Sequence, residues 1–236
     1  MRMLLLILTL ALGIFLLSAS VARRSDSPPP VSRQTIRYLA LGDSYTIGES
    51  VTEAERWPMQ LAEKIKTAPQ FERGLEVTII ARTGWTTNEL WQGIQKTGVI
   101  PPYDLVSLLV GINNQYRGYP LDDYRAEFRY LLGKAIEYAG NDPQKVFVVS
   151  IPDWGITPFA AGRDREQIAA EIDAFNAINH AEAERAGVAY VDITPYSRTA
   201  TANSDLIAPD GLHPSGKMYT GWVEKILPVA LKALEK

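Results

Sequence analysis

The sequence predicts an α/β domain in which a parallel sheet carries helices on both faces. Strand-like and helix-like segments alternate five times along the chain, and each strand-like segment is a short apolar run. Parallel strands are joined by crossover helices and are buried on both faces, which accounts for both features. Because such strands all run in one direction, the loops that follow them meet at one edge of the sheet.

The composition fits one globular domain with an N-terminal extension. The 236 residues are 46% hydrophobic and 22% charged, as in an ordinary folded protein. A net charge of -3, without a basic block, argues against nucleic acid as a partner. The chain has no cysteine and only two histidines, His180 and His213, which excludes a cysteine nucleophile and disfavours a multi-histidine metal site. We therefore expect neither a metal nor a cofactor.

The N-terminus has the pattern of a targeting segment. Residues 1–22 contain a nearly continuous apolar run followed by small residues, which is typical of a secretory signal peptide. The run is short for a membrane span, which needs ~20 residues. Two arginines directly after it also leave open an uncleaved membrane anchor. Residues 23–34, with three consecutive prolines, indicate an extended linker before a domain at 35–236. We expect an exported or membrane-tethered protein, and the sequence carries no signal for an oligomeric state.

The first elements follow from apolar patterning. Residues 38–41 form a buried strand-like run that ends at a Gly-Asp-Ser turn. Trp57, Leu61 and Ile65 recur at helical spacing and predict the first long helix. Residues 75–81 are rich in β-branched side chains, which favours a second strand.

The remaining elements continue the alternation. Thr86 or Thr87 is suited to cap a helix that runs through Leu90 and Ile94. Short apolar runs predict strands at 105–110, 146–151 and 188–193. Longer segments between and after them predict helices at 121–139, 164–186 and 217–234.

Polar residues follow several of these strands and suggest nucleophilic chemistry. Ser44 comes after the first strand, although its triplet taken alone is more typical of an ordinary capped turn. A serine hydroxyl needs a base, and His213 lies in a polar loop with Asp210 three residues before it to orient the ring. The backbone N–H groups of Ser44 and Gly84 and the amide of Asn113 are candidate donors to an oxyanion. Taken singly, each of these is also a common turn or loop residue.

Together these residues resemble the four motifs of the SGNH hydrolase, or GDSL esterase/lipase, family. The motifs are Gly42-Asp43-Ser44, Gly84, Gly111-x-Asn113 and Asp210-x-x-His213, in the order of the family and over nearly the whole predicted domain. The resemblance implies the three-layer α/β/α SGNH fold with a five-stranded, flavodoxin-like parallel sheet. It also implies hydrolysis of carboxylic esters through a serine acyl-enzyme.

By position, the resemblance assigns the catalytic roles. Ser44, Asp210 and His213 form the triad, and Ser44, Gly84 and Asn113 form the oxyanion hole. Asn114 departs from the family, because many members have Asp at this position. The hydrogen bonds that this residue makes are therefore expected to differ from those of the family. The α/β-hydrolase fold shares the triad order, but Ser44 lacks the Gly-x-Ser-x-Gly elbow of that fold.

The substrate is predicted to be a small ester. Tyr45, Trp85, Tyr116 and Trp154 are expected to line the crevice, with core packing as the alternative for each. We find no segment long and apolar enough for a lid, which favours short acyl or acetyl groups, including those on a carbohydrate or lysolipid. Arg117 is expected to be solvated.

Other classes of function stay open. One is a non-catalytic ligand- or carbohydrate-binding module on the same scaffold, which ester turnover would distinguish. Phosphoester hydrolysis is disfavoured, because neither metal ligands nor a phosphate-binding glycine loop is evident.

Overall fold

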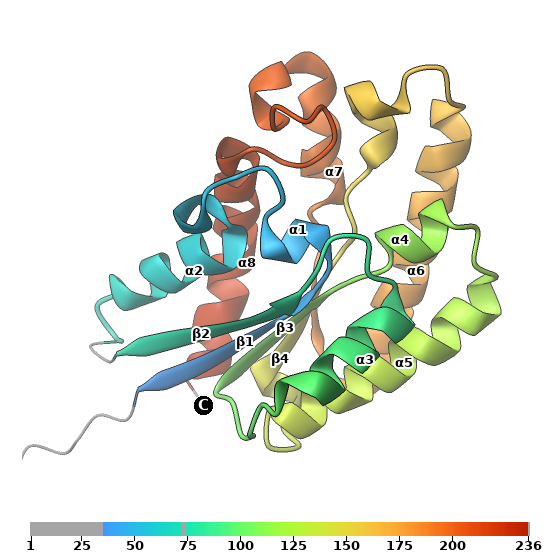
Figure 1. Cartoon of the computed structure of the whole chain (residues 1–236). Coiled ribbons are helices and arrows are strands. Elements are labelled where there is room, and N and C mark those ends of the chain that lie inside the picture. The colour runs from blue at the N-terminus through green and yellow to red at the C-terminus, as the bar shows by residue number, and fades with distance from the viewer. Residues whose placement is uncertain (1–34, 72–73, 236) are drawn as a thin grey trace, which may run out of the picture. The chain divides into compact units, whose positions relative to one another are not determined.

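The computed structural model describes residues 35–71 and 74–235. The predicted signal peptide or anchor, 1–22, and the linker, 23–34, lie outside these residues. Within the described part of the chain, no helix has the length and apolar character that crossing a membrane requires. The described residues form three layers, with a central sheet between two layers of helices (Figure 1).

All five strands are parallel, as the alternation predicts. In sequence order they are β1 (Ile36–Gly42), β2 (Leu75–Ala81), β3 (Leu105–Leu109), β4 (Val146–Val149) and β5 (Ala189–Val191). Their order across the sheet is β2-β1-β3-β4-β5, which is the flavodoxin-like order. The chain reverses direction across the sheet between β1 and β3, and ligands bind outside the strand ends at such a point. Ser44 follows β1 and Asn113 follows β3, so both lie at this point.

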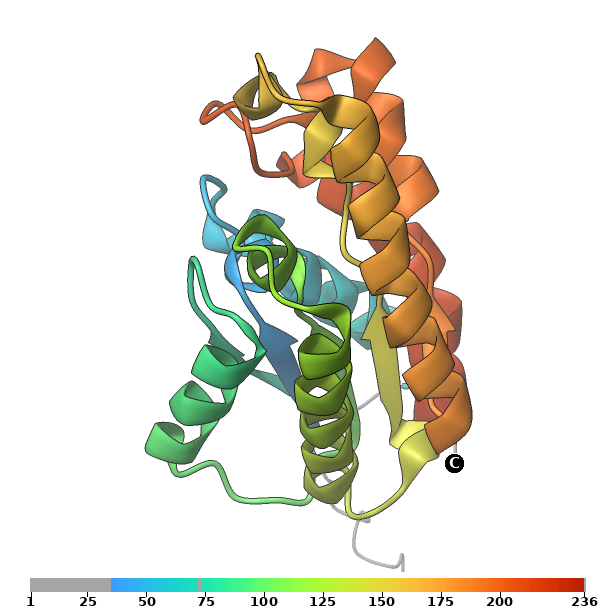
Figure 2. The same ribbon diagram turned by 90° about the vertical axis from the view of Figure 1, so that its right-hand side faces the viewer.

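In the described part of the chain, five long helices cover the sheet, and they lie on both of its faces (Figures 1 and 2). On one face, α2 (Trp57–Lys66) packs against α8 (Gly216–Leu234). On the other face, α5 (Leu121–Tyr138) lies between α3 (Thr87–Thr97) and α6 (Arg165–Ala186). All five were expected from apolar periodicity, and Thr86 is the residue that caps α3, through a capping box with Glu89.

The core lies between the sheet and these helices. Residues 38–41 of β1 and Leu105–Leu109 of β3 are 0% exposed, as is typical of central parallel strands. The predicted stripe of α2 is also buried, and Trp57 packs edge-on against Phe147 of β4 with ring centroids 6.5 Å apart. This packing gives the loops at the carboxyl edge a rigid base.

The main differences from the predicted elements lie at the carboxyl edge. Three strands end one or two residues earlier than expected, at Leu109, Val149 and Val191. Several short helices there were not predicted, because single turns are shorter than the window in which apolar periodicity can be recognised. They are α1 (Ser44–Ile47), α4 (Ile112–Tyr116), α7 (Thr194–Ser197), η3 (Trp154–Ile156), η4 (Pro158–Ala160), η5 (Arg198–Ala202) and η6 (Ser204–Leu206).

Candidate active site

Ser44 is the first residue of α1 and directly follows the turn after β1. The turn is built by its neighbours, since Asp43 caps α1 by accepting a 3.0 Å hydrogen bond from the Tyr45 N–H at Oδ1. A Cβ atom at Gly42 would come within 2.1 Å of Thr46 Oγ1, so a larger residue would push α1 away from β1. The Gly-Asp-Ser triplet is thus both the capped turn and the support of the candidate nucleophile.

The Asp43 carboxyl is buried directly behind Ser44. It is 0% exposed, and Oδ2 has no hydrogen-bond partner among the described residues. Burial raises the pKa of Asp43 to about 7, against the opposing effect of its backbone hydrogen bonds. The charge of this carboxyl therefore changes near neutral pH.

Asp210 and His213 form a close pair in one tight turn. His213 Nδ1 lies 2.6 Å from Asp210 Oδ2, and Oδ1 accepts the N–H groups of Leu212 and His213 at 2.9 and 3.0 Å. Partial burial acts to raise the pKa of Asp210, but hydrogen bonds from Ser50, from the His213 ring and from these two N–H groups hold it well below its usual range. Asp210 is therefore ionised and favours a proton on Nδ1, which leaves Nε2 as the proton acceptor.

One cavity of about 170 Å³ brings the candidate groups together. Ser44, Gly84, Asn113 and His213 all line it, although they come from four separate loops. Within the described residues, Ser44 Oγ makes no hydrogen bond to His213. Such nucleophile–base contacts are often long until substrate binds.

The candidate oxyanion donors are available at this cavity. The backbone N–H groups of Ser44 and Gly84 donate to no other described residue. Gly84 has φ +84°, a conformation that side-chain-bearing residues rarely adopt, so a glycine is needed to turn the backbone this way. Asn113 Nδ2 donates to the Trp85 carbonyl at 2.9 Å, which orients the amide and leaves its second hydrogen free.

Arg117 joins two of these loops. Its Nη2 donates to the Gly84 carbonyl at 2.6 Å, and its Nη1 lies 3.2 Å from Glu89 of α3. The side chain is 42% exposed, as expected for a solvated loop arginine, and it also holds the loop after β2 against the helix after β3. A contact between Thr83 and Glu49 ties the same loop to the segment after α1.

The Asn114 side-chain amide both accepts a hydrogen bond from Thr87 and donates one to it. Its Oδ1 accepts the Thr87 N–H at 3.0 Å, and its Nδ2 donates to Thr87 Oγ1 at 2.7 Å. The Thr87 hydroxyl in turn donates a hydrogen bond to the Glu127 carboxylate. An aspartate at position 114 would compete with Glu127 for that proton, so asparagine is the better partner here.

Three aromatic rings form one wall of the cavity. Tyr116, Trp154 and Phe159 all line it, with ring centroids 5.4 to 6.3 Å apart. The Arg163 guanidinium lies 5.2 to 5.5 Å from all three centroids. Sequence reasoning missed Phe159 and Arg163, because they lie in an irregular loop without periodicity. The only sequence signal that could have indicated Phe159 is a large apolar residue in a loop after a strand.

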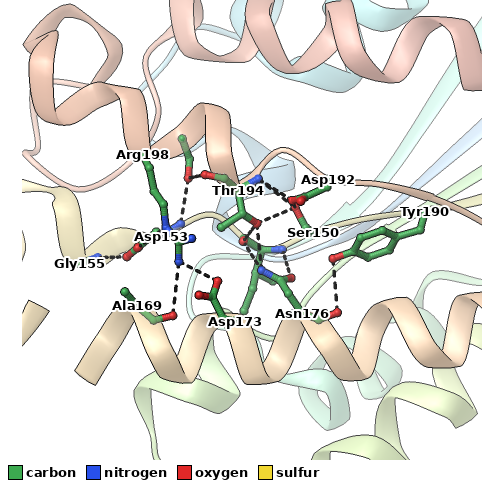
Figure 3. Close-up of polar contacts among 12 residues, drawn as sticks. Ser150, Asp153, Gly155, Ala169, Asp173, Asn176, Tyr190, Asp192, Thr194 and Arg198 are labelled. Atoms are coloured by element: carbon green, nitrogen blue, oxygen red, sulfur yellow. Dashed lines mark hydrogen bonds and ion pairs between the residues drawn. The ribbon is translucent and has the colours of Figure 1, made fainter. Parts of the chain in front are cut away.

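The segment around Asp153 and Gly155 is held by polar contacts to Arg198, which also reaches Asp173 of α6 (Figure 3). Asp153 is 3% exposed, and its carboxylate accepts hydrogen bonds from Gly155 N–H at 2.8 Å and Arg198 Nε at 2.9 Å. Arg198 also pairs with Asp173 of α6 at 2.8 Å. These contacts fix the start of η3 against α6, so the aromatic wall has a rigid support.

The other expected residues divide between the cavity and the core. Tyr45 lines the cavity, and its ring centroid lies 5.1 Å from that of His213. Trp85 does not line it, because the indole lies across Gly93 of α3, where a Cβ atom would be 2.1 Å from the ring. His180 is exposed on α6, away from the cavity, and its ring stacks on that of Tyr190.

Comparison with known proteins adds independent findings. A family model described as the GDSL-like Lipase/Acylhydrolase family matches residues 40–220. No curated protein matches the sequence.

Solved structures with this fold include a lipolytic protein and two esterases. A member of the lipolytic protein G-D-S-L family from Veillonella parvula DSM 2008 has a TM-score of 0.63 and 19% identity, over 82% of this chain and 97% of that one. Axe2, an acetylxylan esterase from Geobacillus stearothermophilus, has a TM-score of 0.63 and 18% identity, over 85% of this chain and 94% of that one. The psychrotrophic esterase EstA from Pseudoalteromonas sp., inhibited by monoethylphosphonate, has a TM-score of 0.62 and 16% identity, over 85% of this chain and 99% of that one. At these identities the likeness concerns the fold.

Proposed function

The chain belongs to the GDSL-like lipase/acylhydrolase family of ester hydrolases, and from this premise we propose that it hydrolyses short-chain carboxylic esters with Ser44 as nucleophile. The observation that carries the proposal is the single cavity that collects Ser44, Gly84, Asn113 and His213. Behind it, Asp210 is held against His213 Nδ1 at 2.6 Å. A nucleophile, a base with its orienting carboxylate and three oxyanion donors are the parts that acyl transfer requires.

The proposed reaction proceeds through an acyl-enzyme. As Ser44 Oγ attacks the ester carbonyl carbon, His213 Nε2 takes the hydroxyl proton, and Asp210 stabilises the resulting imidazolium. The carbonyl oxygen becomes an oxyanion that accepts hydrogen bonds from the N–H groups of Ser44 and Gly84 and from the Asn113 amide. The intermediate then collapses: the bond from carbon to the alcohol oxygen breaks, and His213 gives its proton to that oxygen. Water repeats these steps on the acyl-Ser44 ester and releases the acid.

The size of the cavity supports small acyl groups. A volume of about 170 Å³ is close to that of an engineered cavity that holds one benzene, and well below the ~300–1,000 Å³ of sites for drug-sized ligands. We therefore propose acetyl or other short acyl esters as substrates. The aromatic wall of Tyr116, Trp154 and Phe159 is suited to stack against a sugar or aromatic alcohol at the mouth.

The test is covalent labelling of the nucleophile. We expect the purified protein to hydrolyse p-nitrophenyl acetate and to be inactivated by a p-nitrophenyl alkylphosphonate, with the adduct on Ser44 in peptide mass spectrometry. Ser44→Ala should remove both turnover and labelling, whereas Ser215→Ala, at the N-cap of α8 outside the cavity, should retain both.

Two results would contradict the proposal. An adduct on another residue, or full turnover in Ser44→Ala, would remove Ser44 from the role of nucleophile. Binding of an ester without any turnover would instead favour the non-catalytic binding module.

A further inference from the structure

Ser50 contacts the candidate acid–base pair from outside the family motifs. Its Oγ donates to Asp210 Oδ2 at 2.6 Å, and this is the same oxygen that lies 2.6 Å from His213 Nδ1. The other carboxylate oxygen is occupied by two N–H groups of the turn itself. Among the described residues, Ser50 is the only partner of the Asp210 carboxylate from another part of the chain.

The position of Ser50 connects the two halves of the site. It lies just beyond α1, which begins with Ser44, and is 160 residues from Asp210 in sequence. In the part of the chain that the structure describes, this is the only hydrogen bond between segments 43–50 and 207–215. The hydroxyl therefore links the segment of the nucleophile to the loop of the base.

The backbone at Ser50 is held in an unfavourable conformation. Its φ of +64° lies in the left-handed region, which is uncommon for residues other than glycine. Ser50 is also exposed, so packing in the core does not account for this backbone conformation. Residues kept in such conformations are concentrated at functional sites, where the surrounding structure compensates for the strain. Here the compensating contact is the hydrogen bond to Asp210.

We propose that Ser50 is a positioning residue of the hydrolase, whose hydroxyl fixes the Asp210 carboxylate against His213 and joins the nucleophile and base segments. The inference rests on the proposed function. Ser50 does not line the cavity, so it acts through Asp210 and touches no substrate. Its loss is therefore expected to change kcat and to leave KM unchanged.

The hydroxyl also affects how Asp210 interacts with the ring. By donating to Oδ2, it stabilises the carboxylate and takes up part of the negative charge that faces His213 Nδ1. Without it, more of that charge is available to a protonated imidazole. The protonated, inactive ring is then favoured, and the acidic limb of the pH–rate profile moves to higher pH.

Other titratable groups surround the pair and must be separated from this effect. Burial raises the pKa values of Tyr45 and Tyr219 well above their usual range, so both hydroxyls are neutral throughout. Burial raises the pKa of Asp43 to about 7, and among the described residues Asp43 makes no hydrogen bond to Ser50, so we expect its effect on the profile to be the same in the wild type and in the Ser50 variants. The remaining carboxylates that interact with these tyrosines are Glu49 and Asp153.

Two substitutions separate the hydroxyl from the backbone strain. Ser50→Ala removes the hydroxyl and keeps the strain, and Ser50→Gly removes both. For each we expect kcat on p-nitrophenyl acetate to fall about tenfold, as for loss of a hydrogen bond to a charged group. KM should stay the same, and the acidic limb of the pH–rate profile should move to higher pH. Thr52→Ala is the matched control, because Thr52 donates to the Glu55 carboxylate on the same exposed loop. It should match the wild type.

The outcomes distinguish this inference from the proposed function. If the wild-type protein turns over no ester, the proposed function fails. If the wild type is active and both variants keep kcat and the acidic limb of the wild type, Ser50 has no positioning role. If Ser50→Ala is slow but Ser50→Gly is fully active, the strain and not the hydroxyl is responsible, and the inference is overturned.

Discussion

Two aspartates of the site show how much a single residue depends on its surroundings. Asp43 is fully buried with one oxygen unpartnered, and its pKa rises to about 7. Asp210 is partly exposed and accepts hydrogen bonds from Ser50, Leu212 and His213, which hold its pKa well below the usual range. The first carboxyl is therefore suited to shape a turn, and the second is suited to stay ionised beside an imidazole.

At this scale the clearest prediction concerns Asn113. Asn113→Ala should lower kcat by ~10²–10³ while the protein stays folded, as for removal of one oxyanion donor. The reason is that its amide, oriented by the Trp85 carbonyl, is the only side-chain donor among the three proposed for the oxyanion. Steady-state kinetics with p-nitrophenyl acetate and a thermal melt measure both effects. Asn88→Ala, at an exposed position of α3, is the control. A change of only a few fold would assign Asn113 to loop support.

Among the elements, α5 and α6 are joined by an ion-pair network around one buried carboxylate. Glu182 of α6 is 2% exposed and is contacted by Arg125 and Arg129 of α5 and by Arg185 of its own helix, at 2.8 to 3.1 Å. The hydrogen bond from Arg129 is the largest influence, and with the other two arginines it lowers the pKa of Glu182 to about 2 despite burial. These contacts hold together the helix pair that supports the Asp153 segment.

This network predicts a defined acid dependence of stability. Because the folded pKa of about 2 lies below the usual 4.5, the stabilisation is complete above pH 4.5 and is lost as the pH falls toward 2. Glu182→Gln should therefore lower the free energy of unfolding by about 2 kcal/mol at pH 7, with the difference shrinking toward pH 2. Urea unfolding at pH 7, 4 and 3 measures this. Glu184→Gln, at an exposed position of the same helix, should have no effect. Equal acid dependence in Glu182→Gln and the wild type would contradict the assignment.

For the whole molecule, the position of the cavity follows from the strand order, and its size follows from the loops that line it. The order reverses between β1 and β3, and the loops after four strands and before α8 line an open cavity of about 170 Å³. The described loops here are short helical turns tied to one another, for instance through Phe159 N–H to the Gly211 carbonyl at 3.0 Å. A long acyl chain would remain mostly in water and add little binding energy in the transition state.

The resulting prediction concerns acyl length. Values of kcat/KM for p-nitrophenyl esters from acetate to palmitate, each below its aggregation limit, should be highest between acetate and butyrate. Phe159→Ala removes part of the aromatic wall and should raise the rate for hexanoate relative to acetate. A wild-type rate that continues to rise beyond decanoate would show that an acyl groove exists and would overturn the prediction.

The sequence by itself determined the layers of the fold and the candidate catalytic residues. Apolar periodicity is a local property, so the stripe of Trp57, Leu61 and Ile65 and the buried run of β3 were readable without partners. The alternation of strands and helices also placed Ser44, Gly84 and Asn113 at one edge. The strand order came from the family resemblance, because alternation alone does not specify which strands are neighbours.

Only the tertiary structure decided which side chains support the site. Ser50 meets Asp210 across 160 residues, Arg117 bridges two loops, and Trp85 turns toward Gly93 and away from the cavity. Phe159 belongs to a loop without any repeating pattern, yet it lies beside Tyr116 and Trp154. Loop conformations depend on contacts with residues far away in sequence, whereas helices and strands are specified largely by their own neighbours.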